Sequence, residues 1–192
     1  MSQRYTSRLA SMADIDALTR LMNRAIEAHL SQFLTARQVQ ASFDIMGLDS
    51  QLIEDGTYFA ILDGDDIVGS GGWSYRATRY GGDHTTGRSA RRLDPATEAA
   101  RIRAMYVDPG HARRGLGRRI LDLCEEAARQ SGFTHAELVA TAAGRPLYLA
   151  CGYRVEREHV EATSSGVDVP LWTMRKTLVG TGLADDAIAG PA

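Results

Sequence analysis

Residues 100–119 read ARIRAMYVDPGHARRGLGRR, and this stretch decides how the rest of the chain is interpreted. A run typical of a β-strand ends at Val107, and the turn-forming residues 108–110 break it. Gly115 and Gly117 follow and lead directly into a long amphipathic segment. The unpaired N–H groups and the positive dipole end of a helix start favour a bound phosphate. The stretch therefore predicts a site for a phosphorylated ligand.

The composition indicates one soluble globular domain. The 192 residues are 44% hydrophobic and 24% charged, with a formal net charge of −2, which gives no support to a nucleic-acid partner. Two cysteines, Cys124 and Cys151, are too few for a disulfide framework and favour a reducing compartment. The first residues lack the apolar core of a signal peptide, and no run is long enough to cross a bilayer. We expect a cytoplasmic protein with no membrane partner.

Apolar periodicity and turn signals predict a mixed order of strands and helices. We expect strands at 5–9, 57–62, 67–75, 100–107, 136–141, 153–160 and 169–178, and helices from residue 14, from 36 to 46, at 116–130 and at 146–150. Residues 76–95 form a long polar connection rich in Gly, Thr and Arg, which is typical of a functional loop. We expect a single domain over residues 1–178 and a disordered tail over 179–192.

Two common phosphate loops do not fit the glycine segment. A Walker loop needs Gly-Lys-Ser/Thr, whereas Gly117 is followed by Arg118 and Arg119, with no hydroxyl group to hold magnesium. A dinucleotide-binding loop needs a small residue three positions after its second glycine, and Ile120 stands there.

The segment resembles the central motif of the GNAT superfamily of acyl-CoA-dependent N-acetyltransferases. That motif, Gln/Arg-x-x-Gly-x-Gly/Ala after a strand, aligns with residues 112–117, although Ala112 departs from its first position. Residues 146–153, PLYLACGY, resemble the later Tyr-x-x-x-Gly-Phe/Tyr segment of the family, and the order of elements agrees over residues 4–178. The resemblance implies an α+β fold with a mixed, mostly antiparallel sheet of about seven strands, flanking helices and a splayed parallel strand pair.

The resemblance also implies a site for acetyl-CoA where two parallel strands diverge. The backbone edge of Met105, Tyr106 and Val107 would pair with the pantetheine amides, and a backbone N–H near Tyr106 or Val107 would polarise the thioester carbonyl. The implied pyrophosphate ligands are Arg113, Arg114, Gly115, Leu116, Gly117, Arg118 and Arg119. The histidines show no metal-ligand spacing, so we expect no metal site.

Tyr148 matches the family position of the general acid. A phenol with an ordinary pKa of about 10 is able to donate to a thiolate whose conjugate acid resembles a cysteine thiol, near about 8.5. The alternative is that Tyr148 only packs against the cofactor.

The general base has weaker sequence support. Glu98, upstream of the phosphate loop, is the best carboxylate candidate, with Asp83 and His84 behind it in the long loop. A path through water is an equally consistent alternative. Arg101 and Arg103 cannot act as bases near neutral pH; they either anchor an acidic group on the acceptor or form structural ion pairs.

We expect an N-acetyltransferase that acts on a primary amine, on a small molecule rather than a protein. The arginine-rich loop over residues 76–92 either recognises the acceptor or forms a solvated surface, and Trp73 and Tyr75 either line the acceptor pocket or pack in the core. The resemblance is compatible with a homodimer. Two other functions remain open: a non-catalytic acyl-CoA-sensing module, and a protein N-terminal or lysine acetyltransferase.

Overall fold

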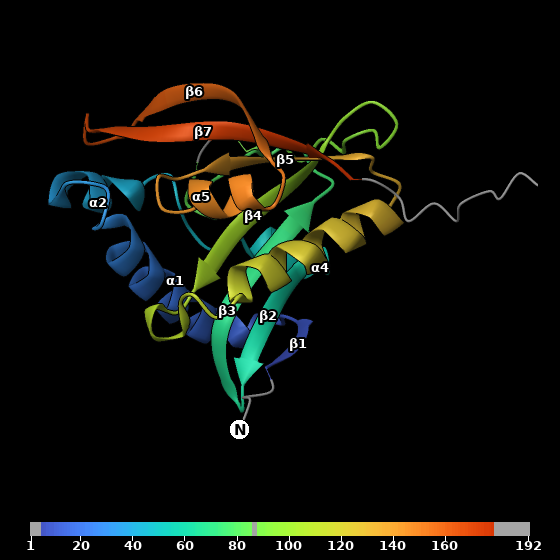
Figure 1. The fold of residues 1–192 in the computed structure, drawn as a ribbon, viewed down its shortest axis with the longest axis horizontal. Coiled ribbons are helices and arrows are strands. Elements are labelled where there is room, and N and C mark those ends of the chain that lie inside the picture. The colour runs from blue at the N-terminus through green and yellow to red at the C-terminus, as the bar shows by residue number, and fades with distance from the viewer. Residues whose placement is uncertain (1–4, 86–87, 179–192) are drawn as a thin grey trace, which may run out of the picture.

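The computed structural model describes residues 5–85 and 88–178, and it contains a seven-stranded sheet with helices on both faces (Figure 1). The strands are β1 (Thr6–Leu9), β2 (Tyr58–Asp63), β3 (Asp66–Ser74), β4 (Ala100–Val107), β5 (His135–Ala140), β6 (Arg154–Ala162) and β7 (Asp168–Thr177). The helices are α1 (Ile15–Leu30), α2 (Ala36–Ser42), α3 (Ser50–Glu54), α4 (Leu116–Gln130) and α5 (Arg145–Ala150). Within the described part of the chain, none of these helices combines the length and apolar character needed to cross a bilayer.

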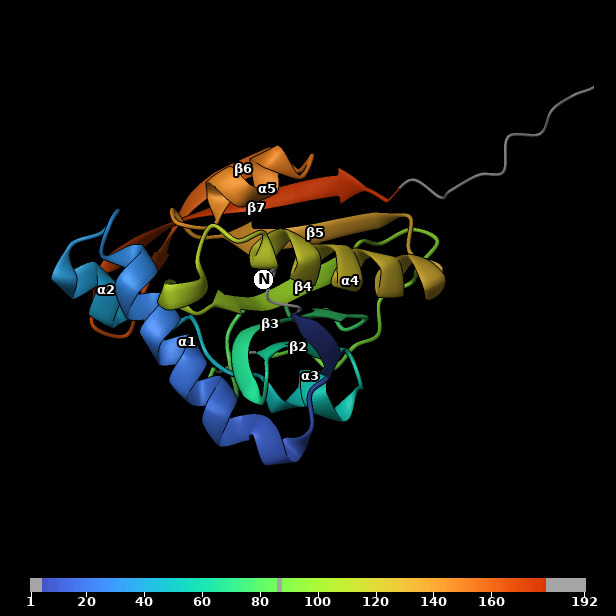
Figure 2. The ribbon, with the colours of Figure 1, turned by 60° about the horizontal axis from the view of Figure 1, so that its bottom comes forward.

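The strand order is β1-β2-β3-β4-β5-β7-β6, and β4 and β5 form the one parallel pair among the described strands. All other neighbours are antiparallel. Figure 2 shows the half built from β1, β2 and β3 below β4, and the half built from β5, β7 and β6 above it. The predicted fold class is confirmed.

The β4–β5 pair separates soon after it forms. Their pairing runs only from Ala100 opposite Ala136 to Ile102 opposite Leu138. Beyond that point β4 continues along β3 as far as Val107, while β5 continues along β7. The two halves of the sheet therefore diverge, and one edge of β4 loses its strand partner.

A β-bulge in β4 lies where the divergence begins. Arg103 and Tyr106 keep partners in β3, whereas Ala104 and Met105 together oppose Gly71. Ala104 has a φ of 51°, in the left-handed region that an alanine rarely adopts. Such an extra residue bends its strand and ends regular pairing.

The bulge also switches which face each β4 side chain occupies. Before it, Ile102 packs in the core cluster that contains α4; after it, Met105 and Val107 pack against that cluster. Ala104 and Tyr106 instead join the cluster that contains α1. One additional residue therefore reverses the alternation along the strand.

The sequence predicted most element positions but not the region after α2. The second predicted helix ends at Ser42 rather than at Met46, and the short helix α3 was not anticipated. Asp49 caps α3, since its Oδ1 accepts from the Gln51 N–H at 3.1 Å. Thr35 caps α2, because its Oγ1 accepts from the Gln38 N–H at 3.3 Å. The tail predicted to be disordered lies outside the described residues.

Close packing of α4 on β3 gives a stability prediction. A Cβ atom on Gly71 would lie 2.5 Å from Ile120 Cγ2 and 2.5 Å from Met105 Sδ. We expect Gly71→Ala to lower the free energy of unfolding by about 1–3 kcal/mol because the core is overpacked. Urea denaturation measures the change.

The matched control is the same substitution in an Ile120→Ala background, where the Ile120 methyl group is absent. We expect the cost of Gly71→Ala to be smaller there, so the two changes are non-additive. An equal cost in both backgrounds would contradict the packing account.

Candidate active site

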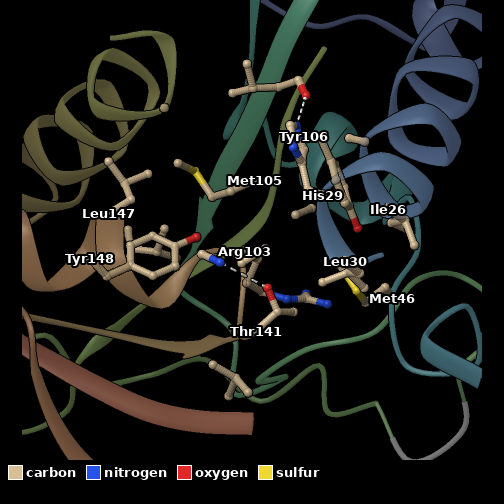
Figure 3. Close-up of a pocket in the computed structure, with 18 of the residues that line it drawn as sticks. Ile26, His29, Leu30, Met46, Arg103, Met105, Tyr106, Thr141, Leu147 and Tyr148 are labelled. Atoms are coloured by element: carbon tan, nitrogen blue, oxygen red, sulfur yellow. Dashed lines mark hydrogen bonds between the residues drawn. The ribbon is translucent and has the colours of Figure 1, made fainter. Parts of the chain in front are cut away.

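A cavity of about 660 Å³ opens where β4 and β5 diverge (Figure 3). Its walls come from α1, the second half of β4, the start of α4, the segment around α5 and the loop at residues 79–81. The cavity therefore joins the predicted phosphate loop to the predicted catalytic tyrosine.

The start of α4 has the geometry of an anion site. Arg113 has a φ of 63° and Gly115 a φ of 81°, so two left-handed residues turn the backbone immediately before the helix. Gly115 occupies the N-cap position, and no side-chain hydrogen bond caps the helix. Backbone N–H groups in such a turn, together with the helix dipole, favour a bound phosphate. Gly117 has a separate function: a Cβ there would lie 2.8 Å from Leu147 Cδ2, so glycine allows α5 to pack closely.

The structure brings only part of the predicted arginine cluster to the cavity. Arg113 and Arg118 line it, as do Gly115, Leu116 and Gly117. Arg114 and Arg119 turn toward the N-terminal strand: Arg114 Nη1 lies 3.1 Å from the Tyr5 hydroxyl, and Arg119 Nη1 lies 2.8 Å from the Tyr5 carbonyl oxygen. Their side chains therefore stabilise the attachment of β1 instead of lining the site.

The exposed edge of β4 forms one wall. Met105, Tyr106 and Val107, which the resemblance assigns to the pantetheine arm, all line the cavity. His29 of α1 also lines it, and its Nε2 lies 2.9 Å from the Val107 carbonyl oxygen (Figure 3). Because a carbonyl oxygen only accepts, His29 Nε2 is the donor in this contact. Sequence reasoning missed His29, since a single histidine on an amphipathic helix has no motif around it.

Tyr148 faces the β4 edge from α5, and Figure 3 shows its hydroxyl group directed into the cavity. The residue is 8% exposed, and its ring packs edge-on against Tyr153 at 5.9 Å between centroids. A Cβ on Gly144 would lie 2.9 Å from Tyr148 Cε2, so glycine is needed there. Burial raises the pKa of Tyr148 above its ordinary value. The phenol is therefore protonated at neutral pH.

Glu98, by contrast, lies away from the cavity. Its carboxylate accepts two hydrogen bonds from Arg91, at 2.7 and 2.8 Å, and a third from the Asp94 N–H at 2.9 Å. The hydrogen bonds from Arg91 lower the pKa of Glu98 to about 2. Glu98 does not line the cavity, and the structure does not bring it together with Tyr148.

The other base candidates also have partners outside the cavity. Asp83 accepts from the Ser50 N–H at 3.0 Å, and His84 Nε2 lies 3.2 Å from the Asp44 carbonyl oxygen. His84 lines a second hollow of about 610 Å³ that shares Arg79, Tyr80 and Ile45 with the main cavity.

The two strand arginines form ion pairs. Arg101 pairs with Glu137 and does not line the cavity. Arg103 does line it, but its guanidinium group pairs with Asp49 and donates to the Gly81 carbonyl oxygen at 2.7 Å. Asp49 is fully buried and also pairs with Arg88. This cluster ties the long loop to β4, and no motif in the sequence pointed to Asp49.

The aromatic residues at the end of β3 belong to the core and the loop. Trp73 is 5% exposed and packs edge-on against Phe133, with 6.0 Å between ring centroids. The guanidinium groups of Arg76 and Arg92 lie 5.3 and 5.0 Å from the ring centroid of Tyr75. Neither aromatic residue lines the cavity. Among the described residues, no group of three or more His, Cys, Asp or Glu side chains is arranged to hold a metal ion.

A sheet that splits between one parallel strand pair, with an uncapped helix start at one end of the gap, defines the fold of the acyl-CoA-dependent N-acetyltransferases. The chain belongs to the acetyltransferase (GNAT) family, whose sequence model matches residues 19–153. It is a GNAT-type acyltransferase, as the sequence analysis predicted. A search of curated proteins finds no match.

Solved structures share this fold at low sequence identity. A GCN5-related N-acetyltransferase from Rhodopseudomonas palustris superimposes with a TM-score of 0.67 at 17% identity, covering 92% of this chain and 98% of its own. YncA, a putative acetyltransferase from Salmonella typhimurium solved with its cofactor acetyl-CoA, gives 0.60 at 20%, covering 95% and 98%. The ribosomal-protein-S18-alanine N-acetyltransferase from Escherichia coli gives 0.57 at 16%, covering 94% and 98%.

The position of Glu98 gives a testable expectation. A carboxylate with a pKa of about 2 is too weak a base to accept a proton from an ammonium group at neutral pH. We expect Glu98→Gln to leave kcat/KM for acetyl transfer within about twofold of the wild type. Carbon-13 NMR of the Glu98 carboxyl group measures its titration independently. A loss of about tenfold or more, or a titration near the ordinary value of about 4.3, would contradict this account.

Proposed function

We propose that this chain transfers an acetyl group from acetyl-CoA to the primary amine of a small molecule, with Tyr148 as the general acid. The observation that carries the proposal is one continuous cavity that extends from the start of α4, along the unpaired edge of β4, to the Tyr148 hydroxyl group. The choice of acyl donor is supported by the relative solved with acetyl-CoA.

The residues along the cavity fit the successive parts of acetyl-CoA. Backbone N–H groups beside Gly115, with the charges of Arg113 and Arg118, would hold the pyrophosphate. The backbone of Met105 and Val107 would pair with the pantetheine amides, as an added strand pairs with a sheet edge. A β4 N–H near the bulge would polarise the thioester carbonyl.

Tyr148 would supply the proton that the departing sulfur needs. The phenol is protonated at neutral pH, and burial raises its pKa further, which makes it a weaker acid. Burial would also raise the pKa of a thiol bound in the same cavity, so the thiolate would be a stronger proton acceptor there.

The amine would lose its proton to water. Among the described residues, no Asp or Glu side chain lines the cavity, and Glu98 is paired elsewhere. A water path, the alternative that the sequence left open, is therefore the proposal.

The long loop supports a small acceptor. Gly82 of this loop packs backbone against backbone on the segment after α2, since a Cβ there would lie 2.7 Å from Gly47 Cα. The loop is held at its base by Arg76, whose Nε donates to Asp55 at 2.6 Å. Gly47 and Gly81 both line the cavity, so this contact forms part of its wall. A pocket bounded in this way would suit a small amine better than an extended polypeptide.

The deciding experiment compares Tyr148→Phe with the wild type. We expect the rate of CoA release to fall about 10²-fold or more, because the proton donor is lost while the ring still fills its place. Calorimetry is expected to show nearly unchanged acetyl-CoA binding, since the hydroxyl group does not hold the cofactor.

Tyr153→Phe is the matched control, because that ring touches Tyr148 but does not line the cavity. We expect its rate per folded molecule to match the wild type. Equal rates for Tyr148→Phe and the wild type would overturn the acid role. Tight acetyl-CoA binding with no CoA release on any amine would overturn the enzyme proposal in favour of a sensing module.

A further inference from the structure

The acceptor side of the cavity lies opposite the start of α4. There the wall is formed by the loop at residues 79–81, the segment after α2 and the facing positions of β5 and β7. These positions lie past the point where β4 and β5 separate, next to Arg103 and the bulge. The chemical groups that this wall binds would determine which amine accepts the acetyl group.

The side chains with a permanent charge on the cavity wall are all positively charged. Arg79 and Arg103 stand on the acceptor side, and Arg113 and Arg118 stand beside α4. No Asp or Glu of the described residues lines the cavity, although Arg103 is paired with Asp49 and Arg79 with Glu137 outside the lining. A wall of this kind repels an acceptor that carries several positive charges and attracts one that carries a carboxylate.

Arg79 is the arginine placed to make that contact. Its side chain is 54% exposed and forms only a long ion pair with Glu137, because its Nε lies 3.6 Å from Glu137 Oε1, beyond hydrogen-bonding distance. Glu137 is already paired with Arg101. Arg103, by contrast, is 3% exposed and is held by Asp49 and the Gly81 carbonyl.

The neighbouring Tyr80 has a hydrogen-bond partner of its own. Burial and a hydrogen bond to Glu161 raise the pKa of Tyr80 to about 12. Glu161 lies on the outer hollow rather than on the main cavity. The Tyr80 hydroxyl is therefore directed away from the acceptor, and its ring adds apolar surface.

The rest of the acceptor side is apolar. The side chains that form it come from four separate elements and pack on one another: Leu30, Ile45, Met46, Val139 and Leu171. An acceptor that fills this space needs an apolar group of moderate size.

From these observations we infer that the acceptor is a free α-amino acid with an apolar side chain, whose carboxylate binds Arg79. This inference rests on the proposed acetyl transfer. The amine nitrogen bonds to the acetyl carbon as the carbon–sulfur bond breaks. Of the two protons that the ammonium group loses, one is released to solvent and the other replaces the proton that Tyr148 gives to the thiolate.

The test compares matched acceptors by their rates of CoA release. L-Leucine is measured against L-leucinamide and 3-methylbutylamine, which keep the amine and the apolar group but lack the carboxylate, and against spermidine, which carries several positive charges. We expect kcat/KM for leucine to exceed each of the others by about tenfold or more, as for a charge-assisted hydrogen-bonded pair.

Arg79→Gln is the matched variant, and Arg91→Gln is its control, because Arg91 lies on the same loop but pairs with Glu98 outside the cavity. We expect Arg79→Gln to lower kcat/KM for leucine about tenfold or more and to leave 3-methylbutylamine nearly unchanged. Arg91→Gln should change neither. Calorimetry with N-acetyl-L-leucine, without acetyl-CoA, should show weaker binding to Arg79→Gln than to Arg91→Gln.

The outcomes separate the two proposals. Turnover of the amide or the simple amine at rates equal to leucine, or an unchanged preference in Arg79→Gln, would overturn the amino-acid inference and leave acetyl transfer standing. Preference for spermidine would do the same. Absence of CoA release on every amine would overturn the proposed function and this inference together.

Discussion

The extra residue in β4 is the constraint on which the site depends. Ala104 takes a left-handed conformation, and the strand beyond it keeps β3 but loses β5. The backbone groups of β4 that β5 would have paired with line a cavity instead. Such an unpaired strand edge is able to form hydrogen bonds with the amide groups of a ligand. The same extra residue moves Met105 and Val107 to the face of the sheet that packs on α4. The β-bulge therefore determines both the wall of the cavity and the packing of α4.

A buried charge cluster completes the site on the opposite side. Asp49 is fully enclosed, and the guanidinium groups of Arg103 and Arg88 neutralise it from β4 and from the long loop. Loss of one partner from such a cluster typically costs about 3–5 kcal/mol, because the remaining charge stays buried and uncompensated. The loop is therefore fixed relative to the bulge, and Arg79 is held at the edge of the space that the bulge creates.

Local signals in the sequence predicted the elements and the two motifs, because caps, turns and apolar periodicity act between near neighbours. They placed Gly115 and Tyr148 on one cavity through the family resemblance. The same local signals did not predict features that depend on residues far apart in the sequence or on the exact path of a turn. An alanine does not indicate a β-bulge, so the bulge at Ala104 could not be predicted from the sequence. The pairing of Glu98 with Arg91 could not be foreseen, because it depends on the turn between them.

The central claim is that the start of α4 and the unpaired edge of β4 hold acetyl-CoA together. Backbone amide NMR of the ¹⁵N-labelled protein, titrated with acetyl-CoA, tests it most directly. The account predicts that the largest shifts fall on the N–H groups of residues 113–118 and of Met105 and Val107, two segments that border one cavity. Saturable binding that leaves both segments unshifted, with its largest changes in the outer hollow beside His84, would contradict it.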